Sequence, residues 1–198
     1  MEYSHEESWE NLEAVLAAKL GIKEAWNRII DYHEHLKPKK YWAALRQLEV
    51  EKEQVEIAQW IEEVVVNTAI PASVEALWFG ITKVWEEEDG KEFYAIYLQG
   101  ADSYDSESIE WVLEPSFDPE DNFGIVEGLN EIDELIAADS DDYAFLDWIL
   151  PIAYCALTLD EIIRTKKLNR ELFLKAKKKL FVTTGFDEGD FVNLTAME

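Results

Sequence analysis

Runs of carboxylates are the residues of this chain best suited to chemistry, because Asp and Glu oxygens are the hard ligands that calcium and magnesium prefer. The runs comprise Asp102, Asp105, Asp118, Glu120, Asp121, Asp139, Asp141 and Asp142. None has the spacing of a known metal loop. The segment 139–147 lacks both the glycine and the final glutamate of a calcium-binding loop. We therefore predict no metal or other cofactor at these residues.

The segment 185–190 is a tighter candidate, since Gly185 and Gly189 allow backbone angles that could bring Asp187 and Asp190 together. These two residues are weak metal candidates, because Asp and Gly are also the usual residues of a plain turn. A metal-dependent hydrolase that uses carboxylates near 118–121 or 187–190 is one alternative function.

Histidine and cysteine form no catalytic pattern. His33 and His35 would point about 200° apart on a helix, whereas zinc-binding helices carry histidines four residues apart. Cys155 lies in an apolar segment, where a thiolate is suppressed, and we predict a core position for it. No nucleophile elbow, phosphate-binding glycine loop or dinucleotide fingerprint is present. An enzyme is therefore unsupported by the sequence.

The strongest compositional feature is a charge asymmetry. Residues 64–163 contain twenty-four Asp and Glu but only two bases, Lys83 and Lys91, while the whole chain carries a net charge of −25. Such a surface attracts cations and repels phosphate. We therefore predict a basic protein as partner, and we expect no binding to nucleic acid. A nucleic-acid mimic that occupies a DNA-binding protein is a further alternative.

Aromatic residues lie among these acids, as in interfaces where rings supply affinity and charge supplies speed. The sequence predicts that the partner binds loops around 100–121 and 139–142. The predicted contact residues are Asp102, Tyr104, Asp105, Trp111, Phe117, Asp118, Glu120, Asp121, Asp139, Asp141 and Asp142.

A basic run at 164–179 has three interpretations. Its lysines could complement a helix dipole, pack against the acidic half, or bind phosphate. The overall negative charge opposes the third.

Three short segments carry a resemblance to a known class of protein. The segments 185–191, with the sequence GFDEGDF, 77–80, with LWFG, and 111–115 together resemble small bacterial proteins of the polymorphic-toxin immunity type. The resemblance covers about a third of the chain. It implies a cytosolic protein that binds the toxic domain of a polymorphic toxin, and it supplies no active-site residues.

The first third of the chain is predicted to be helical. Ser4 and Glu7 form a capping box, and the helix that they open should end near Leu20, with Gly21 as a left-handed stop. Apolar spacing predicts further helices over 26–36 and 40–67.

Strands are expected after Pro71, because 77–85 and 93–98 are short and rich in aromatic and branched residues. Asp89 and Gly90 in the link between them favour a hairpin. A third strand is predicted at 109–113, helices at 129–138, 143–165 and 169–180, and two short strands at 181–184 and 191–194.

These elements predict an α+β fold: an N-terminal helical layer, a central antiparallel meander of about three strands, open to extension by the C-terminal strands, and C-terminal helices. We expect a helical region at 1–70 and an α+β region at 71–198, joined in one compact domain. The N-terminus lacks a secretory pattern, the apolar run 148–159 is too short to span a membrane, and Cys155 stands alone. A cytoplasmic location is the expectation.

Overall fold

The computed structural model describes residues 2–85, 90–120, 122–175, 177–187 and 189–198. Its helices are α1 (His5–Ala17), α2 (Ile22–Leu36), α3 (Tyr41–Leu45), α4 (Val50–Asn67), α5 (Glu127–Ile136), α6 (Tyr143–Arg164) and α7 (Arg170–Leu174), with a 3-10 turn, η1, at Glu110–Val112. The strands are β1 (Ala76–Trp85), β2 (Glu92–Ala101), β3 (Phe123–Ile125), β4 (Phe181–Phe186) and β5 (Phe191–Asn193).

The start of α1 follows the sequence prediction, but its end does not. The Ser4 hydroxyl accepts a hydrogen bond from the Glu7 amide at 3.4 Å. At the other end Lys19 adopts the left-handed conformation, with φ of 52°, whereas Gly21 has φ of −70° and begins α2. The Lys19 ammonium contacts the Asp160 carboxylate and the Thr195 hydroxyl, so tertiary contacts accompany the left-handed residue.

The single helix predicted over 40–67 is two helices, α3 and α4. The chain breaks because side chains of α2 bind its carbonyl groups: the Trp26 indole donates to Leu45 O at 2.9 Å, and the Lys23 ammonium donates to Arg46 O at 2.7 Å and Leu48 O at 3.0 Å. These donors satisfy carbonyls that would otherwise continue the helical pattern.

The predicted three-stranded antiparallel meander is wrong, because the sheet has five strands in the order β3-β2-β1-β4-β5 and includes a parallel pair. The β1–β2 pair is antiparallel, as expected, and so is β4–β5. However, β4 lies parallel to β1, with Ala76 opposite Phe181. The connection through α5 and α6 brings the chain back in the parallel direction. Asp89, predicted in the β1–β2 turn, lies outside the described residues.

The third strand was predicted at 109–113, but this segment forms η1. Trp111 packs edge-on against Trp78 of β1, with ring centroids 6.4 Å apart. The apolar residues of this segment therefore cover part of the sheet and do not form a strand. The neighbour of β2 is β3, where Gly124 pairs with Ile96.

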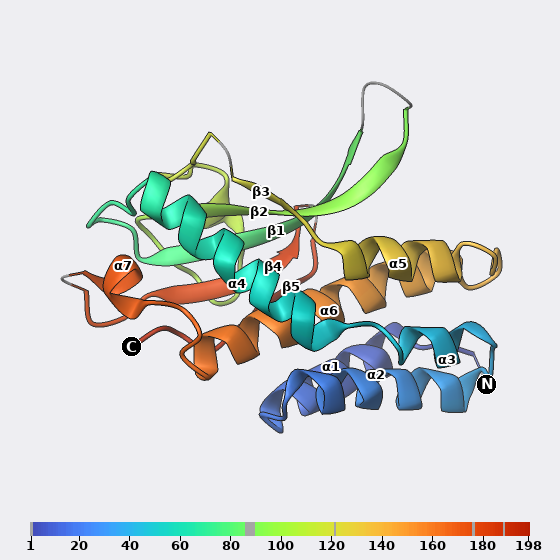
Figure 1. Ribbon diagram of the computed structural model, residues 1–198. Coiled ribbons are helices and arrows are strands. Elements are labelled where there is room, and N and C mark those ends of the chain that lie inside the picture. The colour runs from blue at the N-terminus through green and yellow to red at the C-terminus, as the bar shows by residue number, and fades with distance from the viewer. Residues whose placement is uncertain (1, 86–89, 121, 176, 188) are drawn as a thin grey trace.

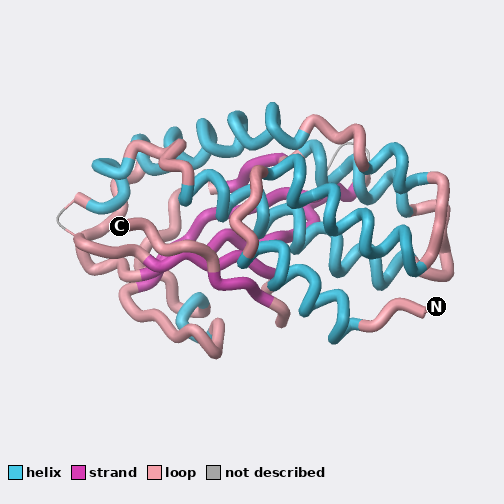
Figure 2. The backbone as a smooth tube through the Cα atoms, turned by 90° about the horizontal axis from the view of Figure 1, so that it is seen from below, coloured by secondary structure: helices cyan, strands magenta, loops and turns pink. Residues whose placement is uncertain are grey.

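Helices cover one face of the sheet. Figures 1 and 2 show α6 running along this face. Leu77, Phe79 and Ile81 of β1 belong to the main core together with α6, whose residues 149–160 are all buried. This core contains residues from Leu12 to Met197, so the helical and α+β regions share it. Within the described ranges, no helix combines the length and the apolar character required to cross a bilayer.

The basic helix predicted over 169–180 is shorter, since α7 ends at Leu174. Asn169 caps it as expected, accepting from the Glu171 amide at 3.2 Å. Beyond α7, two of the lysines donate to backbone carbonyls: Lys175 to Ile70 O at 3.3 Å and Lys177 to Pro71 O at 2.8 Å. Lys178 and Lys179 are exposed.

Candidate functional site

The segment 102–120, which we call the acidic loop, is fastened to the sheet by its aromatic residues. Trp111 is 8% exposed and Phe117 is 3% exposed. Phe117 exchanges two backbone hydrogen bonds with Gly100, at 2.8 and 2.9 Å. Tyr104 stacks on Phe181 with ring centroids 4.1 Å apart. These three rings were predicted to contact a partner. In the structure they hold the loop in place, and Trp111 and Phe117 offer little surface.

The acids of the same loop face solvent, and within the described ranges none of them forms an ion pair. Asp105 accepts from the Glu107 amide at 2.8 Å, and Asp118 accepts from Gln99 at 2.9 Å and Asn122 at 3.0 Å. The other acids of the loop, whose carboxylates accept no hydrogen bond from a described residue, are Asp102, Glu107, Glu110, Glu114 and Glu120. Asp121 lies outside the described residues. The loop therefore carries uncompensated negative charge.

The loop at 139–142 has a different environment. Asp139 pairs with Lys39 at 2.9 Å and accepts a hydrogen bond from the Tyr41 hydroxyl at 3.0 Å, while Asp142 pairs with Lys37 at 2.6 Å. Burial acts to raise the pKa of Asp139, but the hydrogen bonds from Lys39 and Tyr41 outweigh it and hold that pKa below its ordinary value.

Asp141, also predicted to contact the partner, is exposed and has no ion pair among the described residues. The predicted contact residues thus divide into two groups. One group is free to meet a partner, and the other is already neutralised by the protein itself.

The carboxylates of the two weak metal candidates, Asp187 and Asp190, each accept a hydrogen bond from a different aromatic side chain. The Asp187 carboxylate accepts a hydrogen bond from the Tyr97 hydroxyl, and Asp190 accepts one from the Trp148 indole at 2.7 Å. Across the described part of the chain, no three His, Cys, Asp or Glu side chains are placed to share a metal ion. The hydrolase alternative therefore gains no support from the geometry.

A polar cluster joins β1 to α5 and α6. The Lys83 ammonium contacts Asp133 and Asp147, each at 3.2 Å, and the Tyr143 hydroxyl at 3.0 Å. Burial acts to lower the pKa of Lys83, but the Tyr143 hydrogen bond and the two carboxylates outweigh it and raise that pKa. Lys83 therefore stays protonated, which removes it as a nucleophile or base. The cluster borders a cavity of about 500 Å³ that also contacts Asp187.

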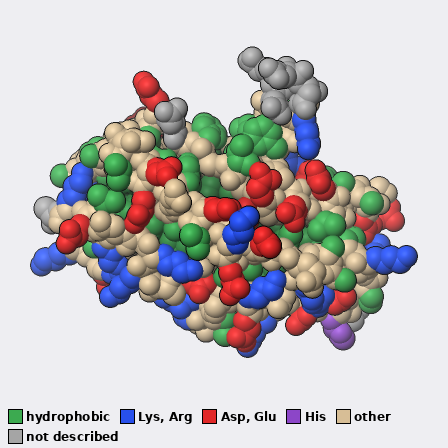
Figure 3. Space-filling model, viewed as in Figure 1, with side chains coloured by type: hydrophobic (Ala, Val, Ile, Leu, Met, Phe, Trp, Pro, Cys, Tyr) green, Lys and Arg blue, Asp and Glu red, His purple; other side chains and the backbone are tan. Residues whose placement is uncertain are grey.

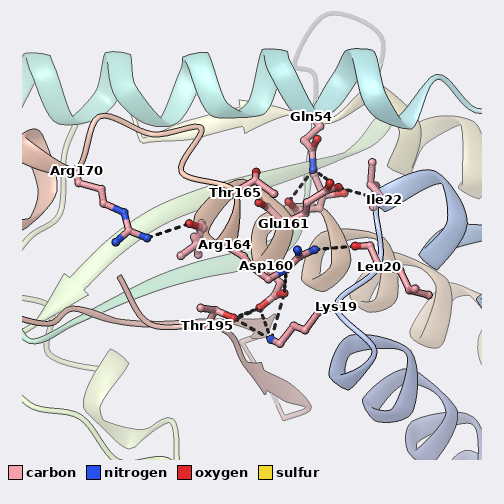
Figure 4. Close-up of polar contacts among 12 residues, drawn as sticks. Lys19, Leu20, Ile22, Gln54, Asp160, Glu161, Arg164, Thr165, Arg170 and Thr195 are labelled. Atoms are coloured by element: carbon pink, nitrogen blue, oxygen red, sulfur yellow. Dashed lines mark hydrogen bonds and ion pairs between the residues drawn. The ribbon is translucent and has the colours of Figure 1, made fainter. Parts of the chain in front are cut away.

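Carboxylates at the end of α6 serve the fold (Figure 4). Asp160 accepts from the Thr195 amide at 2.9 Å and hydroxyl at 2.7 Å, and Glu161 accepts from the Ile22 amide at 2.7 Å and from Gln54 at 2.9 Å. These bonds tie α6 to the start of α2, to α4 and to the C-terminal segment. Both carboxylates therefore have a structural role in joining these segments.

An apolar surface beside the acidic loop was not predicted from the sequence. The loop covers only the half of the second sheet face around Trp78. The other half, which we call the open sheet face, consists of Val84, Phe93, Tyr97, Phe123 and Ile125. Tyr97 lies at the border of the two halves, since it also packs against the Trp78 cluster. Phe123 and Ile125 are 55% and 62% exposed. Figure 3 shows hydrophobic side chains at the upper edge of the molecule, with Asp and Glu interspersed.

The open sheet face is shaped by Gly80. Tyr97 lies directly across from Gly80 in the β1–β2 register, and a Cβ at Gly80 would collide with its ring. The ring therefore lies flat over the strand, with its centroid 5.7 Å from that of Phe123. The alternating sequence of 123–125, Phe-Gly-Ile, is the only local signal for β3, and the longer apolar run at 109–113 is the stronger strand signal in the sequence.

Comparisons with known proteins add no relatives. No family model matches this chain, and neither the curated proteins nor the solved structures contain a match.

Proposed function

We propose that this protein is a non-catalytic acidic protein that binds a basic protein through its acidic loop. One observation supports this proposal above the others: none of the described acids of residues 102–120 forms an ion pair with the protein's own bases. Clustered like charge without compensation costs folding free energy. A cationic partner would remove that cost, and the long-range field would speed the encounter.

A protein partner fits better than nucleic acid. The net charge of −25 repels phosphate. Two bases of the run at 164–179 also serve the fold, since Lys175 and Lys177 donate to the carbonyls of residues 70 and 71. A nucleic-acid mimic would use the same acidic surface and differs from our proposal only in the identity of the basic partner.

The resemblance to immunity proteins makes a toxin domain the partner class that we propose, with the cytoplasm as the compartment. An immunity protein needs no active site, because it works by occupying its toxin. This agrees with the structural roles of Asp160, Glu161 and Lys83.

The test uses the purified products of the genes that neighbour this one in its native genome. Binding of each is measured at low ionic strength and at about 0.15 M, where the screening length is about 8 Å. We expect one basic product to bind, with a rate of association that falls as salt is added. If no basic product binds even at low ionic strength, the proposal fails.

A pair of charge variants locates the surface. The first carries Asp102→Lys, Glu107→Lys and Glu114→Lys in the acidic loop. The control carries Glu2→Lys, Glu10→Lys and Glu51→Lys, which are exposed acids on α1, α4 and the N-terminal segment, so both variants change the net charge equally. We expect the loop variant to associate at least about tenfold more slowly than the control at low salt. Equal rates would show that total charge, and not this loop, governs association.

A further inference from the structure

We propose that the open sheet face is the apolar centre of the same interface, and that it takes an extended segment of the partner in which apolar and basic residues alternate. This inference rests on the proposed function, since it assumes the basic partner. It adds the part of the surface that gives affinity, and it states the conformation and side-chain pattern of the segment that binds.

The strand register gathers the apolar residues on one side of the sheet. Val84 lies opposite Phe93, and Tyr97 lies opposite Phe123. Residues directly opposite one another in antiparallel strands point to the same face. The other end of this face is closed by Trp111 of the acidic loop, so the apolar surface begins where the loop ends.

The position of β3 favours an extended occupant. This strand is the edge of the sheet, and its outer side pairs with no strand in the described structure. Phe123 and Ile125 on it are more than half exposed. An exposed sheet edge with apolar side chains is the surface that binds a partner strand, whose backbone pairs with the edge while alternate side chains contact the face.

The acidic residues beside the open sheet face explain why the bound segment should carry basic residues between its apolar ones. Two exposed carboxylates flank Tyr97 on this face: Asp187 accepts its hydroxyl hydrogen bond, and Asp118 binds the neighbouring Gln99 at 2.9 Å. Both acids act to raise the pKa of Tyr97, after the larger effect of burial, which places both charges near its ring. A segment with apolar residues over Phe123 and bases beside these carboxylates would satisfy both features.

The same charges disfavour a second copy of this chain as the occupant. Pairing two open sheet faces would bring Asp118 and Asp187 of each copy toward the other, together with the acidic loops. Like charges brought together across an interface oppose association. A basic partner meets no such repulsion.

The test compares two synthetic peptides of equal length and charge, one with alternating Lys and Leu and the other with alternating Lys and Ser. Their affinities are measured by fluorescence anisotropy at low ionic strength. The lysines of both peptides are attracted by the acidic loop, but only the Lys–Leu peptide can bury apolar groups on the open sheet face. We expect the Lys–Leu peptide to bind the protein about tenfold more tightly.

The variant Phe123→Ser with Ile125→Ser removes the exposed apolar groups, and Val55→Ser on α4 is the matched control, because Val55 is 57% exposed on another element. We expect the advantage of the Lys–Leu peptide to disappear in the double variant and to persist in the control. Far-UV circular dichroism checks that the double variant is folded. If the double variant does not fold, the wild-type protein is titrated with the Lys–Leu peptide instead. The amide chemical shifts of 123–125 must then move.

The contrary outcomes are separable. If neither peptide binds, the proposed function itself fails. If both bind equally well, or if the advantage survives in the double variant, the acidic surface stands and the open sheet face is not the apolar centre. A wild-type dimer in sedimentation that the double variant abolishes would assign the face to a second copy and overturn this inference.

Discussion

The loops at 102–120 and 139–142 are both rich in acid, yet their carboxylates have opposite surroundings. In the second loop, Asp139 and Asp142 pair with Lys39 and Lys37 from the segment before α3. In the first, the described acids form no ion pair, although aromatic residues fasten the backbone beneath them. One loop uses its charge to join two parts of the fold, and the other presents its charge to solvent.

This difference teaches that the density of acids along a sequence does not measure the charge available to a partner. The Lys37–Asp142 pair joins residues 105 positions apart. A partner that approaches 139–142 meets one exposed carboxylate, Asp141, and two that lysines already neutralise, Asp139 and Asp142. A partner that approaches the acidic loop meets carboxylates whose charge no base of the described structure neutralises.

The largest expected effect is a loss of stability when the packing of the acidic loop on the sheet is removed. Trp111→Ala removes a nearly buried ring that packs on Trp78. We expect a loss of about 3 kcal/mol in the free energy of unfolding, measured by chemical denaturation, because burial and packing of the ring are both lost. A loss below about 1 kcal/mol would mean that the ring does not hold the loop.

A smaller loss should distinguish the two sets of acids. Asp142→Asn leaves Lys37 without its ion pair in a partly buried position. We expect it to cost about 1 to 2 kcal/mol of stability. The matched change Asp102→Asn in the acidic loop should alter stability by less than about 0.5 kcal/mol. If both variants lose the same free energy of unfolding in urea denaturation, the carboxylates of the two loops do not differ in how the protein neutralises them.

Neutralising the acidic loop should stabilise the protein slightly. The variant Asp102→Asn, Glu107→Gln and Glu114→Gln removes mutual repulsion that no base relieves in the described structure. We expect a rise of about 1 °C in the thermal midpoint at low ionic strength, and no rise at about 1 M salt, where the screening length is about 3 Å. A fall in the midpoint at low salt would indicate that these acids do have stabilising partners.

The smallest effect concerns a single titration. The pKa of Asp139 lies below its ordinary value of 3.8. Because it is depressed, its contribution to stability is complete above the unfolded pKa and is lost as pH falls through the folded pKa. Lys39→Met should move the pKa of Asp139 upward, toward 3.8, in a carboxyl NMR titration. An unmoved pKa would show that Lys39 does not neutralise this acid.

Local patterns in the sequence predicted much of the secondary structure. The hairpin of β1 and β2 and the pair β4–β5 followed from short aromatic runs separated by turn residues. The Ser4 and Asn169 caps followed from residue type. The parallel pairing of β4 with β1 could not be predicted in this way, since it depends on how a long connection through α6 returns to the sheet.

The candidate site was predictable only in part. Acid content identified the acidic loop, but the pattern of Trp111 and its neighbours is equally typical of a strand, of an exposed anchor and of a buried lid. The structure places Trp111 in the lid. The open sheet face was missed because exposure of Phe123 and Ile125 depends on where the loop stops covering the sheet, which is a tertiary feature.

The most direct test of the contrast between the loops is an NMR titration of the labelled protein with the Lys–Leu peptide at low ionic strength. Our account predicts that amide shifts move in the acidic loop and at 123–125, while the amides of 139–142 stay still. Shifts at 139–142 as large as those at 102–120 would contradict it, because paired carboxylates would then attract the probe as strongly as unpaired ones.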